Sequence, residues 1–116
     1  MKKAVVHFEI GCGNIPVTVD FYKEVFDWDI RVEGNSATID TGKEGAIPGH
    51  LTKLGENEPE KYINIYIETD ELTHDLKQVE AKGGKTLIGP IELPDGRSFA
   101  WFEDVAGNTL GLITPK

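Results

Sequence analysis

Apolar residues recur every three to four positions along two stretches of this chain, a spacing that predicts helices. In residues 14–28, "NIPVTVDFYKEVFDW", the apolar stripe consists of Val17, Phe21 and Val25, with Tyr22 and Phe26 beside it. In residues 69–85, "TDELTHDLKQVEAKGGK", the stripe consists of Leu72, Leu76 and Val79. The pattern therefore predicts two amphipathic helices.

Residues at the ends of these stretches match known helix caps. Asn14 is placed to cap the first helix, and Pro16 is accepted in a first turn because the amide hydrogen it lacks has no partner there anyway. Thr69 or Asp70 is placed to cap the second helix. Gly83-Gly84 is expected to end it in a left-handed conformation.

Short stretches in which apolar and polar residues alternate surround both helices and predict strands. The predicted strands cover residues 4–10, 29–33, 36–41 and 50–54 in the first half, and 62–68, 85–93, 97–103 and 109–114 in the second. Glycine, asparagine and proline pairs separate them, as in turns. The order is strand, helix and three strands, written twice, which predicts an α+β fold of two βαβββ modules.

Equivalent positions in the two halves lie at a nearly constant distance along the chain. His7 and Asn64 are 57 residues apart, and Gly49 and Gly107 are 58 apart. This indicates an internal repeat within one domain of residues 1–116, with modules at about 1–55 and 62–116 and an acidic linker at 55–61. One module cannot bury both faces of its sheet, so we expect two sheets curved around a shared cavity.

Strand alternation predicts which residues face that cavity. In the first strand Val6, Phe8 and Ile10 form one row, and His7 and Glu9 point the other way. The equivalent strand of the second half has an apolar row of Ile63, Ile65 and Ile67 and an opposite row of Tyr62, Asn64, Tyr66 and Glu68. We expect the apolar rows to pack on the helices and the polar rows to line the cavity.

Composition narrows the class of partner. The formal net charge is −8 and the basic residues are scattered, which argues against a nucleic-acid partner and leaves either plain solubility or attraction of a cationic ligand. No apolar run approaches the roughly 20 residues that cross a bilayer. Cys12 is the single cysteine, so no internal disulfide forms; together with the absence of a secretion signal this predicts a cytoplasmic protein. We expect Cys12 to be a small loop residue.

Three stretches resemble the vicinal oxygen chelate superfamily, which contains glyoxalases, bleomycin resistance proteins and extradiol dioxygenases. "VVHFEI" is similar to the first strand of that family, and "DFYKEVFDW" is similar to the end of its first helix. The stretch from Val79 to Pro115 resembles most of its closing half, including the "GG" pair, the turn that precedes "GN" and the final strand. The resemblance implies the fold predicted above, a small-molecule ligand and a homodimer.

The resemblance also implies four metal-ligand positions in the metal-dependent members. Two of them fall on His7 and Asn64, and the third, normally a glutamate, falls on Gly111. The fourth falls on Asp40, His50 or Thr52. Because Asn64 is a neutral amide and Gly111 has no side chain, we expect that the family metal is not retained. We also expect open space for a ligand above Gly111.

Two alternatives stay open for the site. A rearranged site for a divalent metal would use His7, Glu9 and His50. Without a metal, His7 would line the cavity and Glu9 would be either a general base with a pKa raised by desolvation or a carboxylate paired with Arg97 or a lysine. The expected ligand-binding residues are His7, Asn64, Tyr62, Tyr66, Trp101 and Gly111, with Glu9 as the catalytic candidate.

Three functions follow from these observations. The first is a glyoxalase-like protein or enzyme that binds a small molecule in the cavity without the family metal. The second is a metal-dependent lyase or dioxygenase with a rearranged site. The third is a non-catalytic protein that sequesters a drug, as bleomycin resistance proteins do. We expect His74 to be a solvated residue of the second helix.

Overall fold

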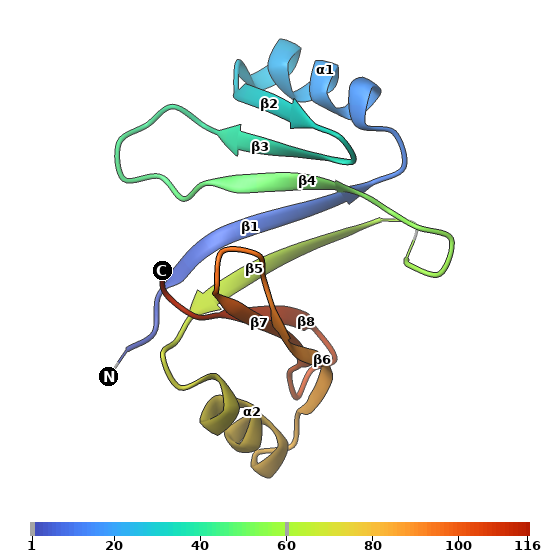
Figure 1. The fold of residues 1–116 in the computed structure, drawn as a ribbon. Helices are drawn as coiled ribbons and strands as arrows, with labels where there is room; N and C mark the ends of the chain where they lie inside the picture. The colour runs from blue at the N-terminus through green and yellow to red at the C-terminus, as the bar shows by residue number, and fades with distance from the viewer. Residues whose placement is uncertain (1, 60) are drawn as a thin grey trace. The chain divides into compact units, whose positions relative to one another are not determined.

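A computed structural model describes residues 2–59 and 61–116 of the chain. These residues form eight strands and two helices, so the predicted α+β class with two βαβββ modules is confirmed (Figure 1). The elements are β1 (Val5–Cys12), α1 (Ile15–Phe26), β2 (Asp29–Glu33), β3 (Ser36–Asp40), β4 (Gly49–Lys53), β5 (Tyr62–Glu68), α2 (Leu72–Ala81), β6 (Lys85–Glu92), β7 (Ser98–Glu103) and β8 (Thr109–Ile113).

The described chain divides into two compact units. The first unit is residues 7–64, and the second unit is residues 2–6 together with 65–116. The shared cavity that the repeat predicts stays a prediction. Each unit is described by itself below.

The first unit contains a sheet in the order β2-β3-β4-β1, with α1 in contact with β2, β3 and β4 (Figure 1). Strands β2, β3 and β4 pair antiparallel, whereas β1 and β4 run parallel. The buried cluster between helix and sheet consists of Cys12, Ile15, Val19, Ile30, Ala37, Ile39 and Leu51. Phe8 and Ile10 pack against this cluster, as the alternation of β1 predicts.

Helix α1 begins as predicted, because the Asn14 side chain accepts a hydrogen bond from the Val17 amide at 3.0 Å. The face it buries differs from the stripe that the sequence suggests. Ile15 and Val19 are buried, whereas Val17 and Phe21 are 65% and 55% exposed. The helix carries two apolar stripes, and periodicity alone does not distinguish the one that meets the sheet.

The second unit contains strands in the order β5-β8-β7-β6, with β5 and β8 parallel and the other pairs antiparallel. Helix α2 contacts β6 and β7 (Figure 1). The buried cluster consists of Leu72, Leu76, Ala100, Phe102 and Leu112, and Val79 and Ile67 pack against it. The predicted stripe of α2 is therefore confirmed.

Three local expectations are corrected. Helix α2 begins after Glu71, and Thr69 bonds the Glu71 amide at 3.0 Å instead of capping the helix. Cys12 is not a loop residue: it ends β1 and is buried in the core of the first unit. Ile63 does not pack on a helix, because its side chain is 73% exposed. Within the described residues, neither helix has the length and apolar character needed to span a bilayer.

Candidate functional site

The face of the first unit that looks away from α1 carries a row of polar side chains. Glu9 of β1 lies opposite His50 of β4, and His50 lies opposite Thr38 of β3. Opposed residues in a sheet point to the same side. The pleat that buries Phe8 and Ile10 against α1 therefore brings Glu9 and His50 together on the other face.

Glu9 is a buried carboxylate, 5% exposed, whose Oε2 atom meets three polar groups. The Tyr62 hydroxyl donates to this oxygen at 2.8 Å, and the Thr52 hydroxyl donates at 3.1 Å. Nε2 of His50 lies 3.2 Å from the same oxygen. The two hydroxyl donors on this oxygen favour the charged form of a carboxylate. Arg97, which the sequence offers as one partner for Glu9, bonds Asp95 at 2.9 Å.

His50 lies between Glu9 and His7. Its Nδ1 is 2.6 Å from Nε2 of His7, and the two rings stack with centroids 4.9 Å apart. His50 thus uses its two nitrogens in opposite directions, one toward each neighbour. The three side chains that the sequence proposes as a metal site therefore lie in contact in the order Glu9, His50, His7.

Tyr62 covers the backbone beside Glu9. A Cβ atom on Gly11 would lie 2.8 Å from the Tyr62 ring, so only glycine leaves room for the ring at this point of β1. Burial raises the pKa of the Tyr62 phenol, and the hydrogen bond to the Glu9 carboxylate raises it further. The phenol therefore stays a hydrogen-bond donor over the whole neutral range.

Asn64 is the most unusual polar residue of this face. Asn64 is only 2% exposed, and neither the oxygen nor the nitrogen of its side chain has a hydrogen-bond partner among the described residues. A buried donor or acceptor without a partner costs about 1–3 kcal/mol. Such a group requires an explanation, and a bound ligand is one.

The second unit places Tyr66, Gly111 and Trp101 in one row, because Gly111 lies opposite both aromatic residues. The Trp101 indole donates to the Tyr66 hydroxyl at 2.8 Å. The Tyr66 ring lies directly over Gly111, where it would overlap a Cβ atom. The expected open space above Gly111 is therefore wrong: the glycine is needed because the ring fills that space.

The four positions implied by the metal-dependent relatives do not supply a four-donor set. Gly111 has no side chain, and the ring of Tyr66 occupies the place where one would extend. Of the candidates for the fourth position, His50 and Thr52 contact Glu9, and Asp40 bonds the Gly42 amide at 2.7 Å. The residues of this chain therefore do not fit the family's metal.

The rearranged metal site also lacks a suitable geometry. A metal ion needs lone pairs that converge on one point about 2 Å from each donor. His50 instead separates His7 from Glu9, since its two nitrogens face opposite neighbours. Among the described residues, no group of three His, Cys, Asp or Glu side chains is arranged to hold a metal ion.

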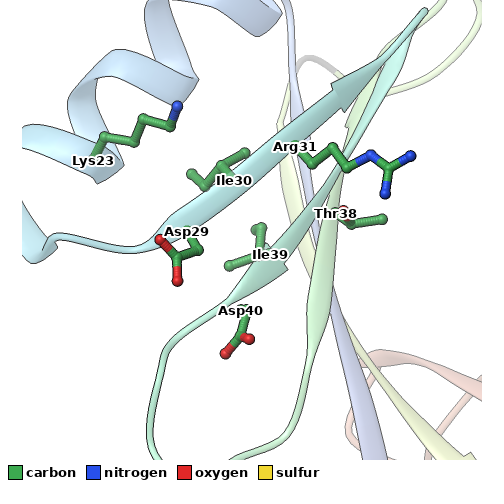
Figure 2. A pocket seen from close by; sticks show the side chains of 7 residues that line it. All are labelled: Lys23, Asp29, Ile30, Arg31, Thr38, Ile39 and Asp40. Atoms are coloured by element: carbon green, nitrogen blue, oxygen red, sulfur yellow. The ribbon is translucent and has the colours of Figure 1, made fainter.

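A hollow of about 310 Å³ lies at another part of the first unit, beside β2 and β3 (Figure 2). It is lined by Lys23, Asp29, Ile30, Arg31, Thr38, Ile39 and Asp40. Its polar side chains carry both signs of charge and are exposed, so they are already solvated. The buried polar groups of β1, β4 and β5 are the stronger candidates for a site.

One role in this site has no sign in the sequence. Thr52 is expected only as a metal position, whereas its hydroxyl donates to Glu9. The pairing of Gly11 with Thr52 across β1 and β4 brings it there, and this register has no signal in the sequence. His74 is exposed on α2, as expected.

Comparisons with known proteins identify the family to which this chain belongs. Residues 4–112 match the sequence profile of the Glyoxalase/Bleomycin resistance protein/Dioxygenase superfamily. A search of curated proteins gave no match.

Solved structures share the fold at low identity. A hypothetical protein from Bacillus halodurans C-125 is 15% identical, with a TM-score of 0.75 over 100% of this chain and 96% of that one. A variant of methylmalonyl-CoA epimerase from Streptomyces coelicolor, in complex with 2-nitronate-propionyl-CoA, is 20% identical, with a TM-score of 0.68 over 95% of each chain. A superfamily member from Vibrio splendidus 12B01 is 13% identical, with a TM-score of 0.69 over 98% and 100%. The chain belongs to the Glyoxalase/Bleomycin resistance protein/Dioxygenase superfamily.

Proposed function

We propose that this chain binds a small organic molecule on the polar face of β1, β4 and β5, without the metal ion of the metal-dependent relatives. The observation that carries the proposal is Asn64. Its amide is buried and has no hydrogen-bond partner among the described residues, although burying an unpaired amide is costly. A ligand that pairs with both of its polar atoms would recover that cost.

The surrounding side chains support a ligand that is held by hydrogen bonds. Strand alternation puts His7 on the same side as Glu9, and Asn64 on the same side as Tyr62. Tyr62 and Glu9 are joined by a hydrogen bond, so each holds the other side chain in place on this face. Polar groups that are locked before a ligand arrives reduce the ordering cost of binding.

The charge of the chain bears on the ligand class. The Streptomyces coelicolor relative was solved with a CoA ester, which is a polyanion. With a net charge of −8, this chain repels such a ligand at long range. We therefore favour a neutral or cationic molecule over a CoA ester.

Glu9 as a general base remains part of the proposal. The two hydroxyl groups that donate to its Oε2 favour the charged carboxylate that a base needs. The same contacts restrict the movement of the Glu9 side chain, so a substrate must bind within reach of the carboxylate where it already lies.

A thermal-shift screen tests the proposal. Small amides, small carboxylates, propionyl-CoA, and Ni²⁺, Zn²⁺, Mn²⁺ and Fe²⁺ are added separately to the purified protein. A ligand at 100 times its Kd stabilises the fold by about 2.7 kcal/mol, so a true ligand raises the melting temperature. We expect a neutral or cationic molecule to do so and the metals to have no effect.

Two variants locate the binding. Asn64→Leu removes the unpaired amide and should abolish the ligand-dependent shift. Gln78→Leu removes an exposed amide of α2 and should leave it unchanged. A large stabilisation by one equivalent of metal contradicts the proposal, and so does binding that survives in the Asn64→Leu variant.

A further inference from the structure

Helix α1 carries apolar side chains on the face that looks away from the sheet of the first unit. Val17, Phe21 and Val25 follow one another at four-residue intervals, so they form one row, here called the outer row, and they are 65%, 55% and 55% exposed. The opposite face of the helix, with Ile15 and Val19, is buried. Contiguous exposed apolar residues mark a surface that contacts another molecule. We propose that the outer row binds a basic amphipathic helix of a partner protein.

The centre of the outer row is held in place before a partner arrives. The Phe21 ring meets the Tyr22 ring edge to face, with centroids 5.3 Å apart. Tyr22 in turn stacks on Trp28 at 4.9 Å, and both of these rings pack against the buried cluster of the first unit. An aromatic ring that is already fixed loses little side-chain freedom on binding, so Phe21 is suited to be the main anchor of an interface.

The charges beside the outer row are negative. Asp20 lies three residues after Val17, and Glu24 lies three residues after Phe21, so both carboxylates border the row on the helix surface. Both acidic residues are exposed. Among the described residues, no ion pair includes Asp20, Glu24 or Lys23, which is the cation of this helix. The carboxylates are therefore available to a cationic partner.

The acidic residues at this end of α1 are costly for the free chain. Like charges four residues apart, as Asp20 and Glu24 are, destabilise a helix. Glu24 also lies in the last turn, where the helix dipole disfavours a negative charge. Asp27 caps the helix with a φ of 58°, a conformation that favours glycine, and it is the one non-glycine residue with a positive φ in the described part of the chain. A cationic partner that pairs with these carboxylates would offset the cost of keeping them.

The apolar row and the charges together define the partner. A helix with apolar residues on one side and Lys or Arg beside them matches both features. A second copy of this chain matches less well, since it carries the same net charge of −8 and the same acidic residues. An anionic lipid surface is repelled for the same reason. The polar face of the first unit lies on the other side of its sheet, so this surface is independent of the proposed small-molecule site.

Two synthetic helical peptides test the proposal. Both have leucine at every third or fourth position, and the remaining residues are mostly lysine in one peptide and mostly glutamate in the other. Each is added to the full chain labelled with ¹⁵N, and the amide signals are followed by NMR. We expect the basic peptide to shift the signals of α1, to bind at least about tenfold more tightly than the acidic one, and to lose affinity as NaCl is added. Equal binding of the two peptides, binding of neither, or shifts confined to other elements overturns the proposal.

A pair of matched variants assigns the contact to the outer row. Phe21→Gln removes the central ring and should weaken binding of the basic peptide at least about tenfold, as the loss of an interface anchor does. Leu87→Gln is the control, because Leu87 is also an exposed apolar residue, at 42%, but belongs to β6. The control should bind as the wild type does. Both positions are exposed, so both variants should fold, which circular dichroism checks. Equal affinities of the two variants overturn the proposal.

The charges are tested by the double variant Asp20→Asn, Glu24→Gln, which keeps the shape of the surface. We expect the basic peptide to bind more weakly to it and with a smaller dependence on NaCl. Its melting temperature should be no lower than that of the wild type, because a repulsion within the helix is removed. An unchanged affinity overturns the choice of a basic partner.

Sedimentation of the chain without peptide tests the second copy as occupant. The wild type and the Phe21→Gln variant should have the same oligomeric state, because the outer row is not covered by another copy. A dimer that is lost in the Phe21→Gln variant means that a second copy covers this row, and it overturns the proposal.

Discussion

Replacing Gly111 with alanine gives the sharpest test of how the second unit is packed. The Tyr66 ring lies over the α-carbon of Gly111, and a Cβ atom there would overlap the ring. The ring has little freedom to move, because Tyr66 is only 6% exposed and its hydroxyl accepts from the Trp101 indole at 2.8 Å. The added methyl group therefore forces either the ring or the strand to shift.

The expected cost is that of overpacking a well-packed site, about 1–3 kcal/mol of unfolding free energy. For a chain of 116 residues this lowers the melting temperature by about 4 °C for each kcal/mol. Moving the ring also strains the bond between Tyr66 and Trp101, so the cost should lie in the upper half of the range.

Urea unfolding followed by circular dichroism measures the change. Gly13→Ala is the matched control, because a Cβ at Gly13 meets nothing within 4 Å. The control should leave the free energy of unfolding within about 0.5 kcal/mol of the wild type.

A double-mutant cycle assigns the cost to the ring. Tyr66→Leu replaces the ring that covers Gly111, so Gly111→Ala should cost clearly less in that background. Equal losses in Gly111→Ala and Gly13→Ala would refute the reasoning, and the glycine would then need another explanation.

Three further predictions concern local contacts. Tyr62→Phe should reduce the loss of unfolding free energy at alkaline pH. Because the pKa of the phenol is raised in the folded protein, the unfolded chain ionises first, and the wild type loses stability as pH rises above about 10. Urea unfolding of both proteins from pH 8 to 11 measures the difference. Lys3→Ala should reduce the loss of unfolding free energy at acid pH. Burial raises the pKa of Asp75, but the hydrogen bond from Lys3 brings it below its ordinary value, so the wild type loses stability as pH falls and Asp75 becomes protonated. Urea unfolding of both proteins from pH 6 to 2 measures the difference. Asn14→Ala should cost about 1 kcal/mol in urea, because the Val17 amide loses its cap; an unchanged midpoint would contradict that role.

The arrangement of elements could be predicted from the sequence because it depends on local patterns. The alternation of β1 and the cap at Asn14 are visible in a few consecutive residues, and both are confirmed. The buried face of α1 could not be predicted. The helix has apolar residues on two sides, and contact with β2, β3 and β4 selects Ile15 and Val19.

The candidate site was predicted in its residues but not in its bonds. Alternation places His7 and Glu9 on one face, whereas the contact with His50 depends on the register between β1 and β4. A sequence gives no sign of that register, so it does not show that His50 contacts both Glu9 and His7. Gly111 illustrates the same limit, because a glycine does not reveal which side chain covers it.

The free energy of unfolding of the Asn64→Leu variant, measured in the absence of ligand, tests the central claim most directly. If Asn64 is kept for a ligand, its unpaired amide destabilises the empty protein, and leucine should raise the free energy of unfolding by about 1–3 kcal/mol while ligand binding is lost. A loss of stability of similar size would contradict the account, because it would mean that the amide already has a structural partner.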